Sequence, residues 1–152
     1  AKLSLDDVDL EAGWLDYPRP KTGVPRRSKL WPETVEAIQA AREVQPVSRG
    51  EHQDLVFLTH RRKPWSNPET STCALAQAFR KLLNDTNLYS RGKTFYALRH
   101  CTETIGSEAR DQIALDVVMG HESPGMASVY RERISDERLI AVSNVIHDWL
   151  YG

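Results

Sequence analysis

The sequence predicts an α+β fold that is mainly helical, with a small antiparallel β-hairpin or sheet at its N-terminal side packed on a helical bundle. Turn residues at 21–23 separate two short segments, 14–17 and 26–30, that suit strands. From Pro32 onward, apolar residues recur mainly at the three- and four-residue spacing of helices. With 152 residues the chain can bury a core of its own, and we expect one domain over 1–152.

The predicted hairpin covers residues 9–30. Lys21-Thr22-Gly23 supplies its turn. Pro18 and Pro20 place it at a sheet edge, because proline cannot donate a ladder hydrogen bond. Pro32 then opens a helix, since its fixed φ suits the first helical position. The apolar face of that helix carries Val35, Ile38 and Ala41.

The middle of the chain predicts a loop over 44–50 and an apolar segment over 55–58. Periodicity allows that segment to be either a short buried strand or an apolar lead-in. A helix start is expected at Asn67-Pro68-Glu69. The helix that follows has an apolar stripe of Leu75, Phe79, Leu82 and Leu83.

Four further helices are predicted in the second half. The first spans 95–107 and the second 113–119, where Gly120 is the usual stop residue. Ser123-Pro124 then restarts a short helix that carries Tyr130. Residues 135–137 cap the last helix. The predicted inner faces are Ala97, Leu98, Cys101 and Ile105 for the first of these helices, and Leu139, Val142, Ile146, Trp149 and Leu150 for the last.

The charge pattern is segregated although the formal net charge is only -1. Five basic residues and no acid occur between residues 19 and 29, and 60–63 form a second basic cluster. A phosphate backbone responds to local patches of this kind, although solvated loops give the same pattern. No apolar run approaches the ~20 residues that span a bilayer, and no secretory leader is expected. Cys73 and Cys101 are expected to be buried thiols in a reducing compartment, which favours the cytoplasm.

Three segments together resemble the tyrosine recombinases, or phage-type integrases. They are PRPKTGVPR at 18–26, FYALRHCTET at 95–104 and VMGHESPGMASVY at 118–130. The resemblance extends from about Leu3 to the end of the chain. It implies the integrase-type catalytic domain. The implied activity is site-specific DNA recombination or integration, by strand cleavage and rejoining through a 3′-phosphotyrosyl intermediate.

The resemblance also assigns catalytic roles, and each has a simpler alternative. Tyr130 matches the nucleophile but could be a surface tyrosine. Arg99 matches a phosphate-binding arginine, or pairs with Glu103 one turn on. His121 matches a histidine that donates to the phosphate or helps to orient Tyr130, or it caps a helix C-terminus. Lys21 matches a hairpin lysine that protonates the leaving oxygen, or is a solvated turn lysine.

Tyr96 departs from the family pattern, which has histidine or lysine three residues before the arginine. It faces the same side as Arg99, and its phenol can donate to a phosphate oxygen or leaving group but cannot carry positive charge. We expect His100 to have a structural role or to support the residues that contact the phosphate. Contacts with DNA phosphates, without sequence readout, are expected from Arg19, Arg26, Arg27, Lys29, Arg61 and Arg62.

The family's first catalytic arginine precedes a segment like 2–9, and no arginine here has that place. We therefore expect an excised piece, truncated at its N-terminus, without the N-terminal DNA-clamping domain and inactive alone. The expected partners are double-stranded DNA and further copies of the chain, as a tetramer on DNA and a monomer or dimer in isolation. The last helix is expected either to dock on a neighbouring copy or to pack on its own domain. No metal and no cofactor are expected. A non-catalytic DNA-binding remnant and a type IB topoisomerase-like enzyme remain the alternatives.

Overall fold

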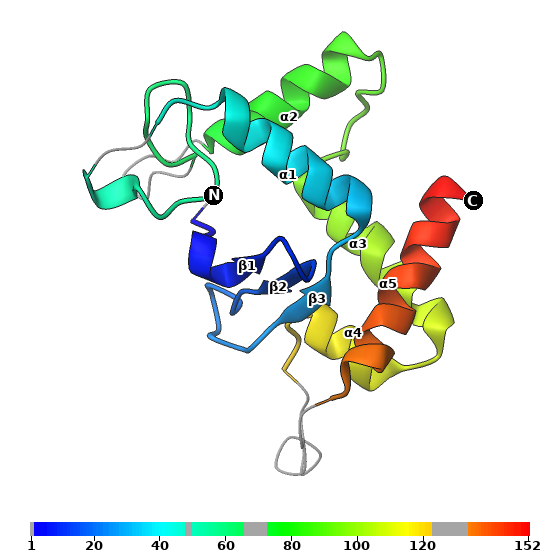
Figure 1. Ribbon diagram of the computed structural model, residues 1–152. Coiled ribbons are helices and arrows are strands. Elements are labelled where there is room, and N and C mark those ends of the chain that lie inside the picture. Colours follow the sequence, from blue (N-terminus) through cyan, green and yellow to red (C-terminus); the bar gives the residue numbers. More distant parts are fainter. Residues whose placement is uncertain (1, 48–49, 66–72, 123–133) are drawn as a thin grey trace. The chain divides into compact units, whose positions relative to one another are not determined.

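The computed structural model describes residues 2–47, 50–65, 73–122 and 134–152 (Figure 1). They form two compact units. The first unit comprises the described parts of Ala1–Asp6 and Glu36–Cys101, and the second those of Asp7–Val35 and Thr102–Gly152. Helix α1 (Pro32–Val44) and helix α3 (Phe95–Gly106) each pass from one unit to the other. The predicted fold class, mainly helical with a small antiparallel sheet, is confirmed.

The sheet belongs to the second unit and has the order β1-β2-β3. Strands β2 (Trp14–Asp16) and β3 (Arg27–Lys29) pair antiparallel, with Trp14 opposite Lys29. They are the two arms of the predicted hairpin, which is confirmed. Strand β1 (Val8–Asp9) pairs with β2 and was not predicted, because two residues are too short to show an alternating pattern. A single turn of 3-10 helix, Leu5–Asp7, leads into it.

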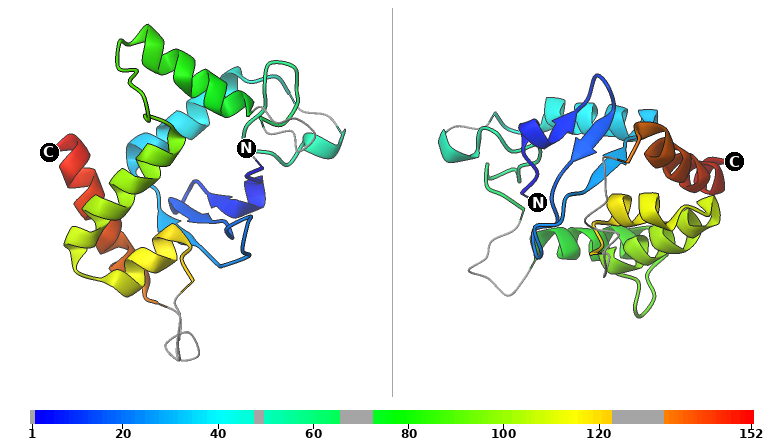
Figure 2. Two further views of the ribbon diagram at one scale, coloured as in Figure 1. Left: turned by 180° about the vertical axis from the view of Figure 1, so that it is seen from behind. Right: turned by 90° about the horizontal axis from the view of Figure 1, so that it is seen from below.

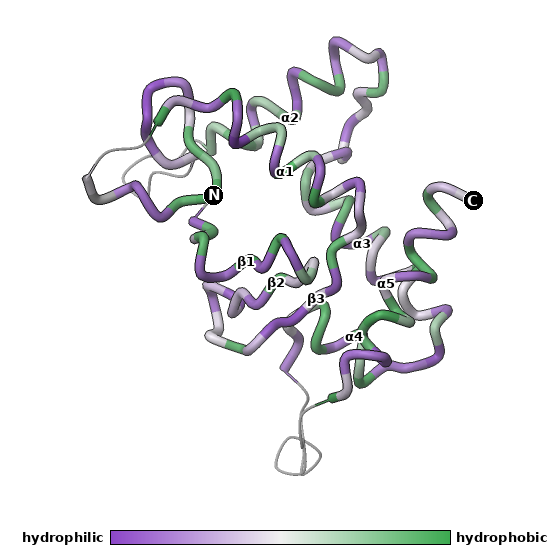
Figure 3. Tube along the Cα trace, in the orientation of Figure 1, coloured by the Kyte–Doolittle hydropathy of each residue, from purple (hydrophilic) through white to green (hydrophobic). Residues whose placement is uncertain are grey.

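Two helices pack with this sheet in the second unit. Helices α4 (Gln112–Met119) and α5 (Asp136–Tyr151) both contact β3 and each other (Figures 1 and 2). A single 3-10 turn, Ser107–Ala109, links α3 to α4. Helix α4 carries mostly hydrophobic residues, as Figure 3 shows along its trace. The buried core of the unit consists of Trp14, Ala114, Leu115, Met119, Leu139, Val142 and Ile146.

Close packing fixes the end of α3 on this core. A Cβ atom at Gly106 would lie 2.7 Å from Leu115 Cδ1 and 3.3 Å from Ile146 Cδ1, so only glycine fits without a shift. The buried Ser143 of α5 then joins the start of α1 to β3. Its hydroxyl accepts from Trp31 Nε1 at 2.8 Å and donates to the Lys29 carbonyl at 3.1 Å. The Ser143 hydroxyl and the Trp31 indole N–H therefore both have hydrogen-bond partners inside the unit.

The first unit contains α2 (Ala74–Asp85), a 3-10 turn at Gly50–His52 and an extended segment with buried Val56 and Leu58. The Gln45 amide accepts from Leu58 N at 3.0 Å and donates to the Val56 carbonyl at 3.1 Å. The Gln45 side chain therefore holds the segment around Val56 and Leu58 in place. It is an apolar lead-in and not a strand, with one isolated bridge between Leu55 and Ser4.

Several predicted burial patterns were wrong in part. Cys73 and Cys101 are exposed, and Leu98 is 49% exposed although it was assigned to an inner helix face. The α5 stripe divides, because its first three residues lie in the core of their own unit whereas Trp149 and Leu150 are exposed. The expected helix starts at residues 67–69 and 123–124 lie outside the described residues.

Candidate active site

Lys21 lies exposed on the turn between β2 and β3, and backbone hydrogen bonds fix that turn. The Arg19 carbonyl accepts from Thr22 N at 3.1 Å and from Gly23 N at 2.8 Å. Arg19 N donates in turn to the Val24 carbonyl at 2.9 Å. Gly23 adopts a φ of 72°, a left-handed conformation that suits glycine. Lys21 therefore stands on a closed turn, with its side chain in solvent.

The base of this turn packs on the end of α4. Gly120 ends that helix with a φ of 65°, and its amide bonds back to the Asp116 and Val117 carbonyls. A Cβ atom there would lie 3.4 Å from Arg19 Cβ and 3.5 Å from Arg26 Cβ and Cδ. Arg19 Nη1 donates to the Gly120 carbonyl at 3.4 Å. Arg26 Nε donates to the Tyr17 carbonyl at 3.2 Å. Two expected DNA-contacting arginines thus flank the residue before His121.

His121 is partly buried and fixed from the preceding turn of α4. Its amide donates to the Asp116 carbonyl at 2.9 Å, and its Nδ1 lies 3.5 Å from Asp116 Oδ1. Asp116 also accepts from Gln112 Nε2 at 2.9 Å. Asp116 was not predicted from the sequence. The sequence feature that could have indicated it is a carboxylate one helical turn before a Gly-His pair that ends the helix.

Arg27 and Lys29 were expected to contact DNA, but the structure gives both a packing role. The Arg27 guanidinium binds Asp16 and Asp136 and lies 4.0 Å from the centre of the Trp14 ring. The hydrogen bond to Asp136 is the main cause that raises the pKa of Arg27 above its ordinary value. Lys29 Nζ donates to the Ala12 carbonyl at 2.5 Å and lies 5.2 Å from the Trp14 ring centre. Contact of either cation with a DNA phosphate stays a prediction.

Tyr96, Arg99 and His100 lie on the part of α3 that belongs to the first unit. Tyr96 is 60% exposed, and its amide donates to Thr94 Oγ1 at 3.2 Å. Its ring meets the His100 ring edge-on, with centroids 4.7 Å apart and planes at 83°. The role of His100 stays a prediction. Arg99 is partly buried.

Arg61 and Arg62, also in the first unit, stand on a compact turn. Thr59 closes it, since its amide donates to the Lys63 carbonyl at 2.9 Å and its hydroxyl accepts from Lys63 N at 3.2 Å. Arg62 has a φ of 60°, which is uncommon for a residue with a side chain. Both arginines are exposed, so the turn presents both side chains to solvent.

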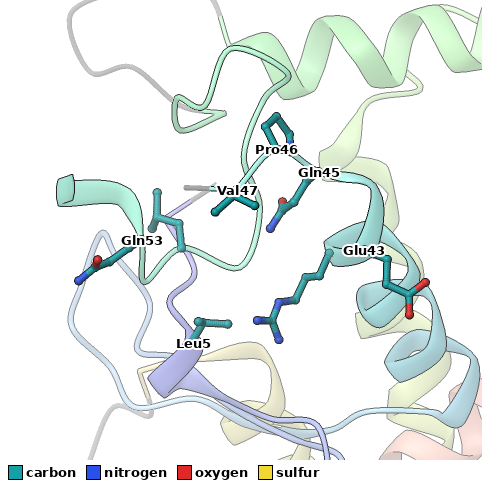
Figure 4. A pocket seen from close by; sticks show the side chains of 8 residues that line it. Leu5, Glu43, Gln45, Pro46, Val47 and Gln53 are labelled. Atoms are coloured by element: carbon teal, nitrogen blue, oxygen red, sulfur yellow. The ribbon is translucent and has the colours of Figure 1, made fainter. Parts of the chain in front are cut away.

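The candidate residues therefore fall into two groups. The second unit joins the Lys21 turn, Arg19, Arg26 and His121, and the first unit holds Tyr96 and Arg99. Convergence of Arg99 with His121 stays a prediction, and Tyr130 lies outside the described residues. A pocket of about 300 Å³ in the first unit, lined by Leu5, Arg42, Glu43, Gln45, Pro46, Val47, Gln53 and Leu55, contains none of the candidates (Figure 4).

The described residues offer neither a metal site nor a membrane span. No group of three or more His, Cys, Asp or Glu side chains in the described ranges is arranged to hold a metal ion. Within the same ranges, every helix is too short or too polar to pass through a bilayer.

The fold is similar to that of solved recombinase structures. XerA recombinase matches with a TM-score of 0.61 and 20% identity, over 94% of this chain and 49% of that chain. Two structures of the transposon Tn1549 integrase with circular intermediate DNA match with TM-scores of 0.62 and 0.61 and identities of 18% and 17%. They cover 94% of this chain and 52% and 53% of theirs. The chain thus spans about half the length of these proteins.

At these identities the structures establish the fold, and a sequence profile supplies the family. No curated protein matches the chain. The profile of the phage integrase family matches residues 1–137, which is most of the 152 residues. Because the match includes the Lys21 turn, the Arg99 helix and the Gly120-His121 pair, the chain belongs to the phage integrase family of tyrosine recombinases.

Proposed function

We propose that this chain supplies the nucleophile Tyr130 and the residues around it for the strand cleavage and rejoining of a site-specific DNA recombinase, and that full activity also needs the family's first catalytic arginine. The substrate is double-stranded DNA, and the intermediate is a 3′-phosphotyrosyl bond. Family membership and fold support recombination through tyrosine in general. The residue roles and the activity of the chain are part of the proposal.

Four side chains take part in the proposed cleavage step. The Tyr130 oxygen bonds to phosphorus as the bond from phosphorus to the 5′ oxygen breaks. The phenol gives its proton to water, and Lys21 gives one to the 5′ oxygen, which otherwise re-attacks. Arg99 binds two non-bridging oxygens with its planar fork, and Tyr96 donates beside it. The stored phosphotyrosyl bond lets the strand rejoin without ATP.

The observation that carries the proposal is the packing of the hairpin on Gly120. The contact between Arg19 Nη1 and the Gly120 carbonyl at 3.4 Å attaches the Lys21 turn to the residue before His121. The two family segments that supply Lys21 and His121 are far apart in sequence but meet in one unit. A shared site requires this contact.

Asp116 gives His121 a defined orientation. If Nδ1 donates to the carboxylate at 3.5 Å, the other ring nitrogen is available to a phosphate oxygen. The pair then acts as a carboxylate-oriented donor. Asp116 is the residue whose removal should weaken His121 without touching DNA.

A second candidate function is that of a non-catalytic DNA-binding remnant. Tyr96 favours it, because the phenol cannot supply the positive charge that histidine or lysine gives at this place. On both readings the basic turn at 59–63 contacts the phosphate backbone. We further propose assembly of several copies on DNA, and cytoplasmic action.

The test is covalent trapping with the protein translated from the complete reading frame. A duplex nicked close to the cleavage site loses a short fragment after attack, so the protein stays attached and migrates slowly on a denaturing gel. Tyr130→Phe should give no adduct yet bind DNA. Tyr89→Phe, at a tyrosine that contacts Arg80, is the matched control and should keep the adduct. An adduct with Tyr130→Phe would refute the assignment, and none with the unaltered protein would favour the remnant.

A further inference from the structure

We propose that Arg19 is a positioning residue for Lys21, holding the lysine's turn at the His121 end of α4 so that the lysine can reach the leaving oxygen. This inference rests on the proposed function, because it takes Lys21 to be the proton donor. It adds a residue that acts through the lysine.

The backbone of Arg19 closes the turn on which Lys21 stands. Its carbonyl accepts from Thr22 and Gly23, and its amide donates to Val24 at 2.9 Å. These bonds fix the course of the chain on both sides of Lys21. They do not fix where the turn lies relative to α4.

The side chain of Arg19 supplies that second constraint. Nη1 reaches the Gly120 carbonyl, 101 residues further along the chain, at 3.4 Å. The Arg19 Cβ also lies 3.4 Å from the place of a Cβ on Gly120, so the arginine stem rests on the glycine backbone. One residue therefore joins the turn to the helix end, and His121 follows directly in sequence.

The charge of Arg19 is used differently from that of Arg27 on the same hairpin. Arg27 binds two carboxylates, Asp16 and Asp136. Among the described residues, no carboxylate pairs with Arg19. Its guanidinium instead meets a main-chain carbonyl at the negative end of α4, where a cation is favoured. A contact with a neutral carbonyl is weaker than an ion pair and can be remade when the turn adjusts to DNA.

The simpler reading is that Arg19 only caps α4 and contributes to stability. The two readings differ in which chemical step depends on the arginine. A cap affects folding and every step alike. A residue that positions Lys21 affects only the protonation of the leaving oxygen.

A substrate with sulfur in place of the bridging 5′ oxygen separates these readings. A thiol has a pKa of ~8.5, far below that of an alcohol, so the thiolate leaves without a proton donor. On this substrate the Lys21 step is bypassed, whereas attack by Tyr130 and charge stabilisation by Arg99 are still needed.

The experiment measures single-turnover cleavage of the oxygen and sulfur substrates by the full-length protein. Lys21→Ala and Arg19→Ala should both slow cleavage of the oxygen substrate, the lysine change by the ~10²-fold or more expected for a lost general acid and the arginine change by less. Both should cleave the sulfur substrate within about twofold of the unaltered rate, since neither residue then contributes. The double variant should be no slower than Lys21→Ala alone, because coupled residues are not additive.

Arg19→Gln provides a second variant if alanine impairs folding, because its amide keeps a donor on a long side chain. Lys81→Ala removes one positive charge from the surface of α2, outside the proposed machinery, and should leave both rates unchanged. If the sulfur substrate rescues Lys21→Ala but neither Arg19 variant, the inference about Arg19 is wrong and the proposed function stands. If it does not rescue Lys21→Ala, the role of Lys21 fails and the inference fails with it. If the unaltered protein gives no tyrosine adduct, the proposed function itself fails.

Discussion

Arg27 and Asp136 form a two-point ion pair that joins strand β3 to the first turn of helix α5. Arg27 Nε lies 3.0 Å from Asp136 Oδ1, and Nη2 lies 2.9 Å from Oδ2. The carboxylate stands at a helix N-terminus, where negative charge is favoured. The pair therefore holds the base of the hairpin against the helix that carries Leu139 and Val142 into the core.

Arg27→Ala should lower the free energy of unfolding by about 1–3 kcal/mol, because it leaves Asp16 and Asp136 without their cation and exposes Trp14. Urea unfolding measures this. Lys81→Ala is the control, since its pair with Asp85 is exposed on α2 and should contribute no more than about 0.5 kcal/mol. An Arg27→Ala protein that kept its stability but bound DNA less tightly would contradict the structural role and support the predicted DNA contact of Arg27.

Asp111 should make stability depend on pH in the acid range. Its carboxylate accepts from Arg138 Nε and Nη2, each at 2.7 Å, and from Ala114 N at 3.0 Å. The hydrogen bond from Arg138 is the main cause that lowers the pKa of Asp111. A lowered folded-state pKa stabilises the fold above the unfolded value of ~3.9, and this contribution is lost as pH falls through the lower folded value.

Asp111→Asn isolates that charge, because asparagine still caps a helix N-terminus. The unaltered protein should be more stable at pH 7 by about 1 kcal/mol, and the difference should vanish as the pH falls below ~4. Urea unfolding at a series of pH values provides the comparison. A difference that stayed constant throughout the acid range would mean that Asp111 acts through shape alone.

The turn at 59–63 should bind DNA phosphates in a salt-dependent way. Arg61→Ala with Arg62→Gly removes two positive charges while glycine keeps the left-handed φ of 60° at position 62. The slope of log affinity against log salt should fall by about 0.9 for each phosphate that the protein no longer neutralises. Titration of a labelled duplex at several salt concentrations gives the slope. Lys81→Ala should leave it unchanged, and an unchanged slope in the double variant would remove this turn from the interface.

Local signals predicted the elements that local chemistry determines. The turn at 21–23, the proline at the start of α1 and the glycine that ends α4 each have a preferred backbone conformation, and all three were confirmed. Strand β1 was not predictable because two residues are too few to show an alternating pattern. The conformation of 55–58 was not predictable because it depends on the Gln45 side chain, which lies outside the segment.

The candidate site was predictable for a different reason. Its residues were found by family resemblance, which gives identity and order but not contacts. The resemblance therefore could not show that Asp136, 109 residues away, binds Arg27. It is also why Asp116 and the link between Arg19 and Gly120 were missed, since such contacts follow from tertiary packing.

The central claim is that Tyr130 forms the bond to DNA, and the peptide that carries the trapped adduct tests it most directly. Trypsin cleaves after Arg110 and Arg131, and Tyr130 is the sole tyrosine of the 111–131 peptide, whereas Tyr96 falls in the 94–99 peptide. After nuclease digestion of the DNA, mass spectrometry should find the residual nucleotide mass on 111–131, with fragment ions assigning it to Tyr130. A nucleotide on 94–99, or on any residue other than Tyr130, would contradict the account.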